Sequence, residues 1–193
     1  MTEMFQKFIP LWVSLCAFFQ AACGQNNPAN RLGHCENPTF DREVASWLRF
    51  TVPAIDVDTL YDLPAASVLI LDAREPGEYA VSHIEGAVNC GYDHFDRAML
   101  DTLDKSRPVV VYCSIGYRSE KIAQKLIKAG FTNVSNLYGS IFEWVNRGYP
   151  LVDANGQRTV RLHTFNSDWG RWVSNSSCEK VTTGNTPAPQ QKN

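Results

Sequence analysis

Two short apolar runs constrain the fold of this chain more than any other feature. Residues 68–71 and 109–112 are continuously apolar, and the second run is rich in valine. Neither run alternates with polar residues, as a strand with one face in water would. Strands that are apolar throughout are typical of a parallel sheet covered on both faces. The two runs therefore predict neighbouring strands in such a sheet.

The segments around these runs have helical periodicity. In the clearest one, residues 119–129, Ile122, Ala123 and Leu126 share one face, and Gly130 follows where a helix-ending glycine would stand. Weaker helices are predicted over 42–50, 57–63, 95–103 and 141–146, and a further strand over 133–137. Alternating strands and helices predict an α/β fold with three layers, in which helices cover both faces of a central, mostly parallel sheet.

The N-terminus has the pattern of an export signal. Residues 8–22 contain no charge, and this run is short for a membrane span of ~20 residues but suits a signal peptide. Ala21-Ala22-Cys23 resembles a bacterial lipobox, in which the cysteine is lipidated, although Gln20 stands where that pattern usually has leucine. The alternative is ordinary cleavage after Gly24. We expect an exported protein, in the periplasm or anchored through Cys23 as an outer-membrane or cell-surface lipoprotein.

The remaining chain divides around one domain, in keeping with a length of 193 residues. After the signal segment (1–23) come a linker and helix (24–50), the α/β domain (51–152) and an extension (153–173). The extension carries Leu162, Phe165, Trp169 and Trp172, which we expect to pack on the domain. Residues 174–193 are polar, with proline and glycine, and are predicted to form a disordered tail.

Charge and ligand-type residues exclude some function classes. The chain has 18 Lys and Arg against 20 Asp and Glu, a net charge of −2, which argues against a nucleic-acid partner. His163 and Asp168 have no companion set of metal ligands nearby in the sequence. We therefore predict neither a metal site nor a bound cofactor.

The loop after the second apolar run has the features of a nucleophilic site. Cys113 follows the strand directly, and Ser119 is well placed as the N-cap of the helix over 119–129. The loop thus lies at the carboxyl end of a parallel strand, where open α/β sheets bind ligands. Loop N–H groups, the helix dipole and Arg118 lower the pKa of a cysteine there, and Gly116 lets the loop turn.

A lone cysteine after a strand is more often a small buried apolar residue. Here the ordered set Cys-x-x-Gly-x-Arg-Ser, from Cys113 to Ser119, favours a thiolate nucleophile inside an anion-binding loop.

Several segments, taken in order, resemble the rhodanese family over roughly residues 51–152. The loop from Cys113 to Arg118 resembles its Cys-x-x-x-x-Arg active site, which is shorter than the loop of related phosphatases and favours sulfur over phosphate by analogy. The other matching segments are Asp72-Ala73-Arg74 with Glu78-Tyr79, His83 to Asn89, Tyr138 to Trp144 and Gly148 to Leu151. In the segment from Tyr138 to Trp144, Ser140 replaces the second glycine of the family's Gly-Gly pair, which leaves the local backbone packing open.

The resemblance implies a sulfurtransferase. Cys113 would take the outer sulfur of a small anionic donor such as thiosulfate, hold it as a persulfide and pass it to a thiol or cyanide acceptor. It further implies that the loop stabilises the bound sulfur and substrate, and that three other residues shape the scaffold. The loop residues are Ser114, Ile115, Gly116, Tyr117, Arg118 and Ser119, and the scaffold residues are Asp72, Arg74 and His83.

Two other functions stay open on the residues alone. One is a non-catalytic rhodanese-fold module that binds a partner or carries or senses sulfur. The other is a thiol-redox protein, for which Cys90 is the candidate second thiol, although we expect it to be buried. Cys35 and Cys178 flank the domain, and we hypothesise a disulfide between them, because exported proteins can keep such bonds.

Overall fold

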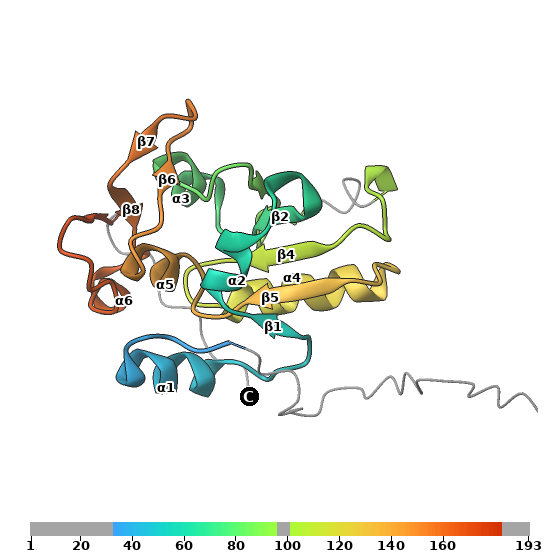
Figure 1. Cartoon of the computed structure of the whole chain (residues 1–193), viewed down its shortest axis with the longest axis horizontal. Helices are drawn as coiled ribbons and strands as arrows, with labels where there is room; N and C mark the ends of the chain where they lie inside the picture. The colour runs from blue at the N-terminus through green and yellow to red at the C-terminus, as the bar shows by residue number, and fades with distance from the viewer. Residues whose placement is uncertain (1–32, 96–100, 183–193) are drawn as a thin grey trace, which may run out of the picture.

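The computed structural model describes residues 33–95 and 101–182, and its centre is a five-stranded parallel sheet (Figure 1). The strand order is β1-β5-β4-β2-β3, and every neighbouring pair is parallel. The strands are β1 (Ala54–Ile55), β2 (Leu69–Asp72), β3 (Val88–Asn89), β4 (Val109–Tyr112) and β5 (Val134–Leu137). The two apolar runs of the sequence are β2 and β4, which pair along their whole length.

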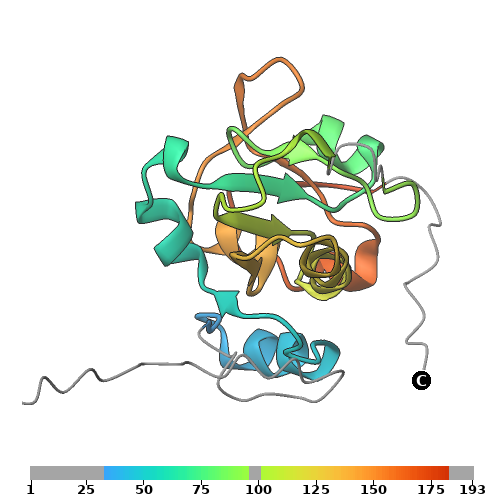
Figure 2. The same ribbon diagram turned by 90° about the vertical axis from the view of Figure 1, so that its right-hand side faces the viewer.

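Alternate residues of β4 enter two different hydrophobic cores of the described structure. Val109 and Val111 belong to a core with residues of α4 (Tyr117–Lys128), whereas Val110 and Tyr112 belong to a core with residues of α5 (Ser140–Asn146). The second core also contains residues of α1 (Pro38–Trp47) and α2 (Val57–Asp62). Figure 2 views α4 nearly along its axis, beside the sheet. The sheet is therefore the middle of three layers, as predicted.

The segments that flank the domain form part of its core. Phe40 and Val44 of α1 are fully buried, and so is Leu162 of β8 (Arg161–His163). The two flanking segments also touch each other, because the rings of Phe40 and Trp172 stack with centroids 5.6 Å apart. The extension further contains β7 (Arg158–Thr159) and α6 (Ser167–Gly170). β7 pairs with β6 (Leu151–Val152) at the end of the α/β domain, and α3 (Pro76–Val81) lies against β8 (Figure 1).

The prediction of a disordered tail is wrong for residues 174–182. This segment carries β9 (Glu179–Val181), which pairs in parallel with β8. Its composition is polar, but the pairing supplies hydrogen-bond partners for its backbone, and Lys180 Nζ donates to the carbonyl of Gly170 at 2.8 Å. Residues 183–193 of the predicted tail lie outside the described residues, as does all of the predicted signal segment.

Several predicted boundaries shift. The helix predicted over 42–50 begins earlier, at Pro38, because Asn37 Oδ1 caps it by accepting hydrogen bonds from the N–H groups of Thr39 and Phe40. The helix predicted over 95–103 lies partly outside the described residues. The hypothesised disulfide is not formed in the described structure, where Cys35 and Cys178 both keep their thiols. No helix in the described segments is long and apolar enough to cross a membrane.

Candidate active site

Cys113 stands at the carboxyl end of β4, at the start of the loop that leads into α4. Its side chain is only 1% exposed, and β4 is the middle strand of the sheet. Helix α4 begins at Tyr117, so the prediction of Ser119 as its N-cap is wrong. Gly116 is the N-cap, with φ 120°, a backbone conformation that an L-residue rarely adopts. The turn therefore closes three residues earlier, and Ser119 lies in the first turn of the helix.

The loop points polar groups at the sulfur. The N–H of Gly116 donates to Cys113 Sγ at 3.2 Å, and Ser119 Oγ lies 3.6 Å from the same sulfur. Asn136 on β5 fixes this geometry, because its Nδ2 donates to the Gly116 carbonyl at 3.0 Å and its Oδ1 accepts from Ser119 Oγ at 2.6 Å. The backbone of Gly116 is thus held at both groups, since its carbonyl accepts from Asn136 and its N–H donates to the sulfur.

The surroundings of Cys113 favour its thiolate. Burial of the sulfur raises its pKa, but the charge of Arg118 and hydrogen bonds from the N–H groups of Ser119 and Gly116 outweigh this effect. The pKa of Cys113 is therefore lower than that of an ordinary cysteine. Cys90 behaves in the opposite way, since burial and the nearby Asp72 raise its pKa to about 12. Of these two thiols, only Cys113 has the character of a nucleophile.

Arg118 is held in place by a buried carboxylate. Its Nη1 and Nη2 donate to the two oxygens of Glu78 at 2.6 and 2.9 Å, and Nη2 also donates to Ser114 Oγ at 3.0 Å. Both charged side chains are less than 10% exposed. Because every one of these bonds fixes the guanidinium, Arg118 acts as a fixed positive charge beside the loop and ties the loop to α3.

Ser140 links α5 to the backbone of Cys113. Its Oγ accepts a hydrogen bond from the N–H of Cys113 at 3.1 Å and donates to the carbonyl of Leu137 at 2.9 Å. Ser140 is fully buried and has φ 51°, in the left-handed region. The preceding Gly139 is also left-handed, and a Cβ there would lie 2.7 Å from Cys35 Sγ. The serine thus replaces a glycine at a strained position, but its hydroxyl satisfies the backbone of Cys113.

The residues predicted to support the scaffold make their contacts away from the sulfur. Arg74 Nε and Nη2 donate to the two carboxylate oxygens of Asp72 at 3.0 and 2.6 Å, and both side chains are fully buried. The ring of His83 stacks on Tyr79, and its Nδ1 lies 3.1 Å from the Tyr79 carbonyl. None of these three residues lines the cavity at Cys113.

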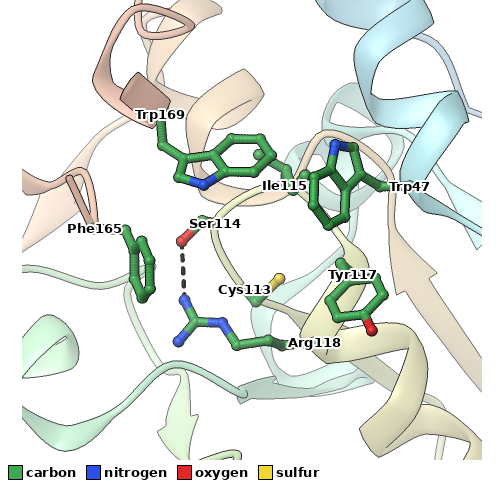
Figure 3. A pocket seen from close by; sticks show the side chains of 8 residues that line it. All are labelled: Trp47, Cys113, Ser114, Ile115, Tyr117, Arg118, Phe165 and Trp169. Atoms are coloured by element: carbon green, nitrogen blue, oxygen red, sulfur yellow. Dashed lines mark hydrogen bonds between the residues drawn. The ribbon is translucent and has the colours of Figure 1, made fainter. Parts of the chain in front are cut away.

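A small cavity lies above Cys113, with a water-accessible volume of about 20 Å³. Figure 3 shows the aromatic side chains around it. Of the loop residues that the sequence singled out, Ser114, Ile115, Tyr117 and Arg118 line it and Gly116 and Ser119 do not. Trp47, Phe165 and Trp169 from the flanking segments line it too. Sequence reasoning missed Trp47 and assigned Phe165 and Trp169 to packing alone. The sequence indicates Glu78 and Ser140 only as parts of matching segments. No local signal predicts the contact of Glu78 with Arg118 or that of Ser140 with Cys113.

Comparison with known proteins places this site in a family. Residues 56–147 match the rhodanese-like domain. A sulfurtransferase of Allochromatium vinosum is 35% identical over 89 residues, which are 46% of this chain and 82% of that protein. A thiosulfate sulfurtransferase of Coxiella burnetii is 35% identical, over 46% of this chain and 80% of that protein. A thiosulfate:glutathione sulfurtransferase of Saccharomyces cerevisiae is 30% identical, over 45% of this chain and 71% of that protein.

Among solved structures, a rhodanese-related protein from Thermoplasma volcanium is similar to this chain, with 28% identity and a TM-score of 0.47. The match covers 51% of this chain and 96% of that one.

Proposed function

Because the chain belongs to the rhodanese-like family, we propose that it is a sulfurtransferase that carries sulfur on Cys113. The thiolate of Cys113 attacks the outer sulfur of a donor such as thiosulfate. A bond forms between the two sulfurs, the sulfur–sulfur bond of the donor breaks, and sulfite leaves with the electron pair. An acceptor, either a thiolate or cyanide, then attacks the outer sulfur of the persulfide, and Cys113 leaves as the thiolate again.

The observation that carries this proposal is the lowered pKa of Cys113 inside a loop of inward-pointing donors. A thiolate both attacks and leaves well, so the same feature serves both half-reactions. The charge of Arg118 and the N–H of Gly116 stand in place before the reaction and stabilise negative charge on the sulfur.

The relatives named as thiosulfate sulfurtransferases support thiosulfate as the donor, and the relative named as a thiosulfate:glutathione sulfurtransferase supports a thiol acceptor. Steady-state kinetics with thiosulfate and cyanide test the proposal. We expect parallel lines in double-reciprocal plots, which indicate a two-step transfer, and no turnover by Cys113→Ser. Cys90→Ser is the matched control, because Cys90 is buried beside Asp72 and its pKa is raised. Turnover that survives in Cys113→Ser would contradict the assignment of Cys113 as the nucleophile. A wild-type protein that forms the persulfide but does not turn over would be a sulfur carrier instead.

We propose in addition that the protein is exported, with Cys23 as a lipidated first residue. The uncharged run over residues 8–22 and the small residues before Cys23 support this proposal. The mass of the mature N-terminus tests it. A diacylated or triacylated Cys23 is the expected result, and an unmodified Gln25 as first residue would contradict lipidation but not export.

A further inference from the structure

The cavity above Cys113 is bounded by side chains that do not belong to the matched family domain. Trp47 comes from α1, and Phe165 and Trp169 come from the C-terminal extension, whereas the rhodanese-like match spans residues 56–147. We call these three side chains the aromatic gate. In Figure 3 they surround the loop that carries Cys113.

The gate is closed on one side. The rings of Trp47 and Trp169 meet edge to face with centroids 5.2 Å apart, and Trp47 meets the ring of Tyr117 in the same way at 5.6 Å. Three aromatic rings thus form a continuous wall. On the other side Phe165 lies over the guanidinium of Arg118, 5.5 Å from the ring centroid.

The gate is fixed by the fold beneath it. Glu120 of α4 accepts hydrogen bonds from the N–H groups of Arg49 and Thr51, which hold the end of the segment that carries Trp47. The N–H of Phe165 donates to Nδ1 of the buried His163 at 3.1 Å, and Phe165 is held at φ 67°. These contacts hold the backbone next to Trp47 and at Phe165, and Trp47 Nε1 itself donates to Glu43 Oε1 at 3.0 Å.

The part of the cavity next to Cys113 is narrow. A water-accessible volume of about 20 Å³ is close to the ~10–15 Å³ that a single water needs. The outer sulfur of thiosulfate is a single terminal atom, and cyanide is a linear ion of two atoms, so both can present the reacting atom to Cys113. The thiol of glutathione is also a terminal sulfur, but it is attached to a branched tripeptide that is larger than this space.

We infer that the aromatic gate restricts the sulfur acceptor to small nucleophiles, such as cyanide or a two-carbon thiol, and disfavours thiols as large as glutathione. The inference rests on the proposed function, since it names the acceptor class for the same persulfide. The transfer step is unchanged: the acceptor's electron pair forms the new bond to the outer sulfur, and the bond to Cys113 breaks with its electrons on Cys113.

The test measures a single transfer. The full-length protein is loaded with thiosulfate, freed of excess donor and mixed with cyanide, 2-mercaptoethanol or glutathione, and loss of the extra sulfur is followed by intact mass. At equal thiolate concentration, we expect glutathione to discharge the sulfur at least about tenfold more slowly than 2-mercaptoethanol. We expect Trp169→Ala to reduce the ratio of the 2-mercaptoethanol rate to the glutathione rate by about tenfold, since it removes one wall of the cavity.

Trp172→Ala is the matched control, because Trp172 lies in the same extension, packs on Phe40 and does not line the cavity. It should leave the ratio unchanged. Phe165→Gly is a second variant that, like Trp169→Ala, removes an aromatic wall and opens the cavity, and glycine accepts the left-handed backbone at that position. Equal discharge by the two thiols in the wild type, or an unchanged ratio in both opening variants, overturns the inference.

Alkylation of Cys113 separates the gate from the proposed function. The rate at which each reagent alkylates Cys113 is divided by its rate with a free thiol. We expect this relative rate to be higher for iodoacetamide than for a glutathione-sized maleimide. Trp169→Ala should reduce the difference. If thiosulfate loads no sulfur but this size dependence is present, the sulfurtransferase proposal fails while the gate stands. If the size dependence is absent, the gate fails whatever happens to the sulfur.

Discussion

Substitution of Ser140 tests how the fold positions Cys113. Ser140→Ala removes the hydroxyl that accepts from the N–H of Cys113 at 3.1 Å and keeps a Cβ at φ 51°. A buried N–H left without an acceptor costs ~1–3 kcal/mol, so we expect Ser140→Ala to lower the free energy of unfolding by that amount. Ser140→Gly loses the same hydrogen bond but relieves a left-handed strain of ~1 kcal/mol. It should therefore be about 1 kcal/mol more stable than Ser140→Ala.

Urea unfolding followed by tryptophan fluorescence measures both variants, provided that the slope against urea is unchanged. Ser46→Ala is the control, because Ser46 is an exposed serine whose Oγ donates to the Glu43 carbonyl, and its effect should stay within ~0.5 kcal/mol. Wild-type stability in Ser140→Ala would refute the role of the hydroxyl. A glycine variant less stable than the alanine variant would refute the argument from backbone strain.

Two further predictions concern the charges around Cys113. Glu78→Gln should lower the free energy of unfolding by ~3–5 kcal/mol, because it leaves Arg118 buried without a carboxylate. Burial raises the pKa of Glu78, but Arg118 lowers it below its usual value, so wild-type stability should fall as the pH drops below ~4.3. Urea unfolding at several pH values should show that the free energy of unfolding depends less on pH in Glu78→Gln than in the wild type. Equal pH dependence in the two proteins would contradict the pairing of Glu78 with Arg118. The rate of Cys113 alkylation by iodoacetamide should rise with pH, with a midpoint below ~8.5, the usual pKa of cysteine. Arg118→Gln should move this midpoint to higher pH. An unchanged midpoint in Arg118→Gln would show that its charge does not act on the sulfur.

The strands, and the place of Cys113 at the end of one of them, could be predicted because their signals are local. The run over 109–112 is apolar at every position, and both of its faces are buried in the structure. A cysteine directly after such a strand lies at the ligand-binding end of a parallel sheet. The position of Cys113 in the fold therefore followed from a few consecutive residues.

Other parts of the site depend on contacts between distant segments. Glu78 meets Arg118 across the fold, and Trp47 meets Trp169 although each lies in a different flanking segment. The start of α4 was placed too late because a serine is a good N-cap by composition, whereas here Gly116 makes the turn at φ 120°. β9 was missed because a polar strand of this length has no periodicity of its own and is ordered by its pairing with β8.

The central claim is that Cys113 accepts a sulfur atom from the donor. It is tested most directly by incubating the protein with thiosulfate and measuring its intact mass, followed by peptide mapping. We predict a gain of one sulfur atom on Cys113 in the wild type, its removal by cyanide with release of thiocyanate, and no gain in Cys113→Ser. A wild-type protein that gains no sulfur, or a Cys113→Ser variant that gains as much as the wild type, would contradict the account.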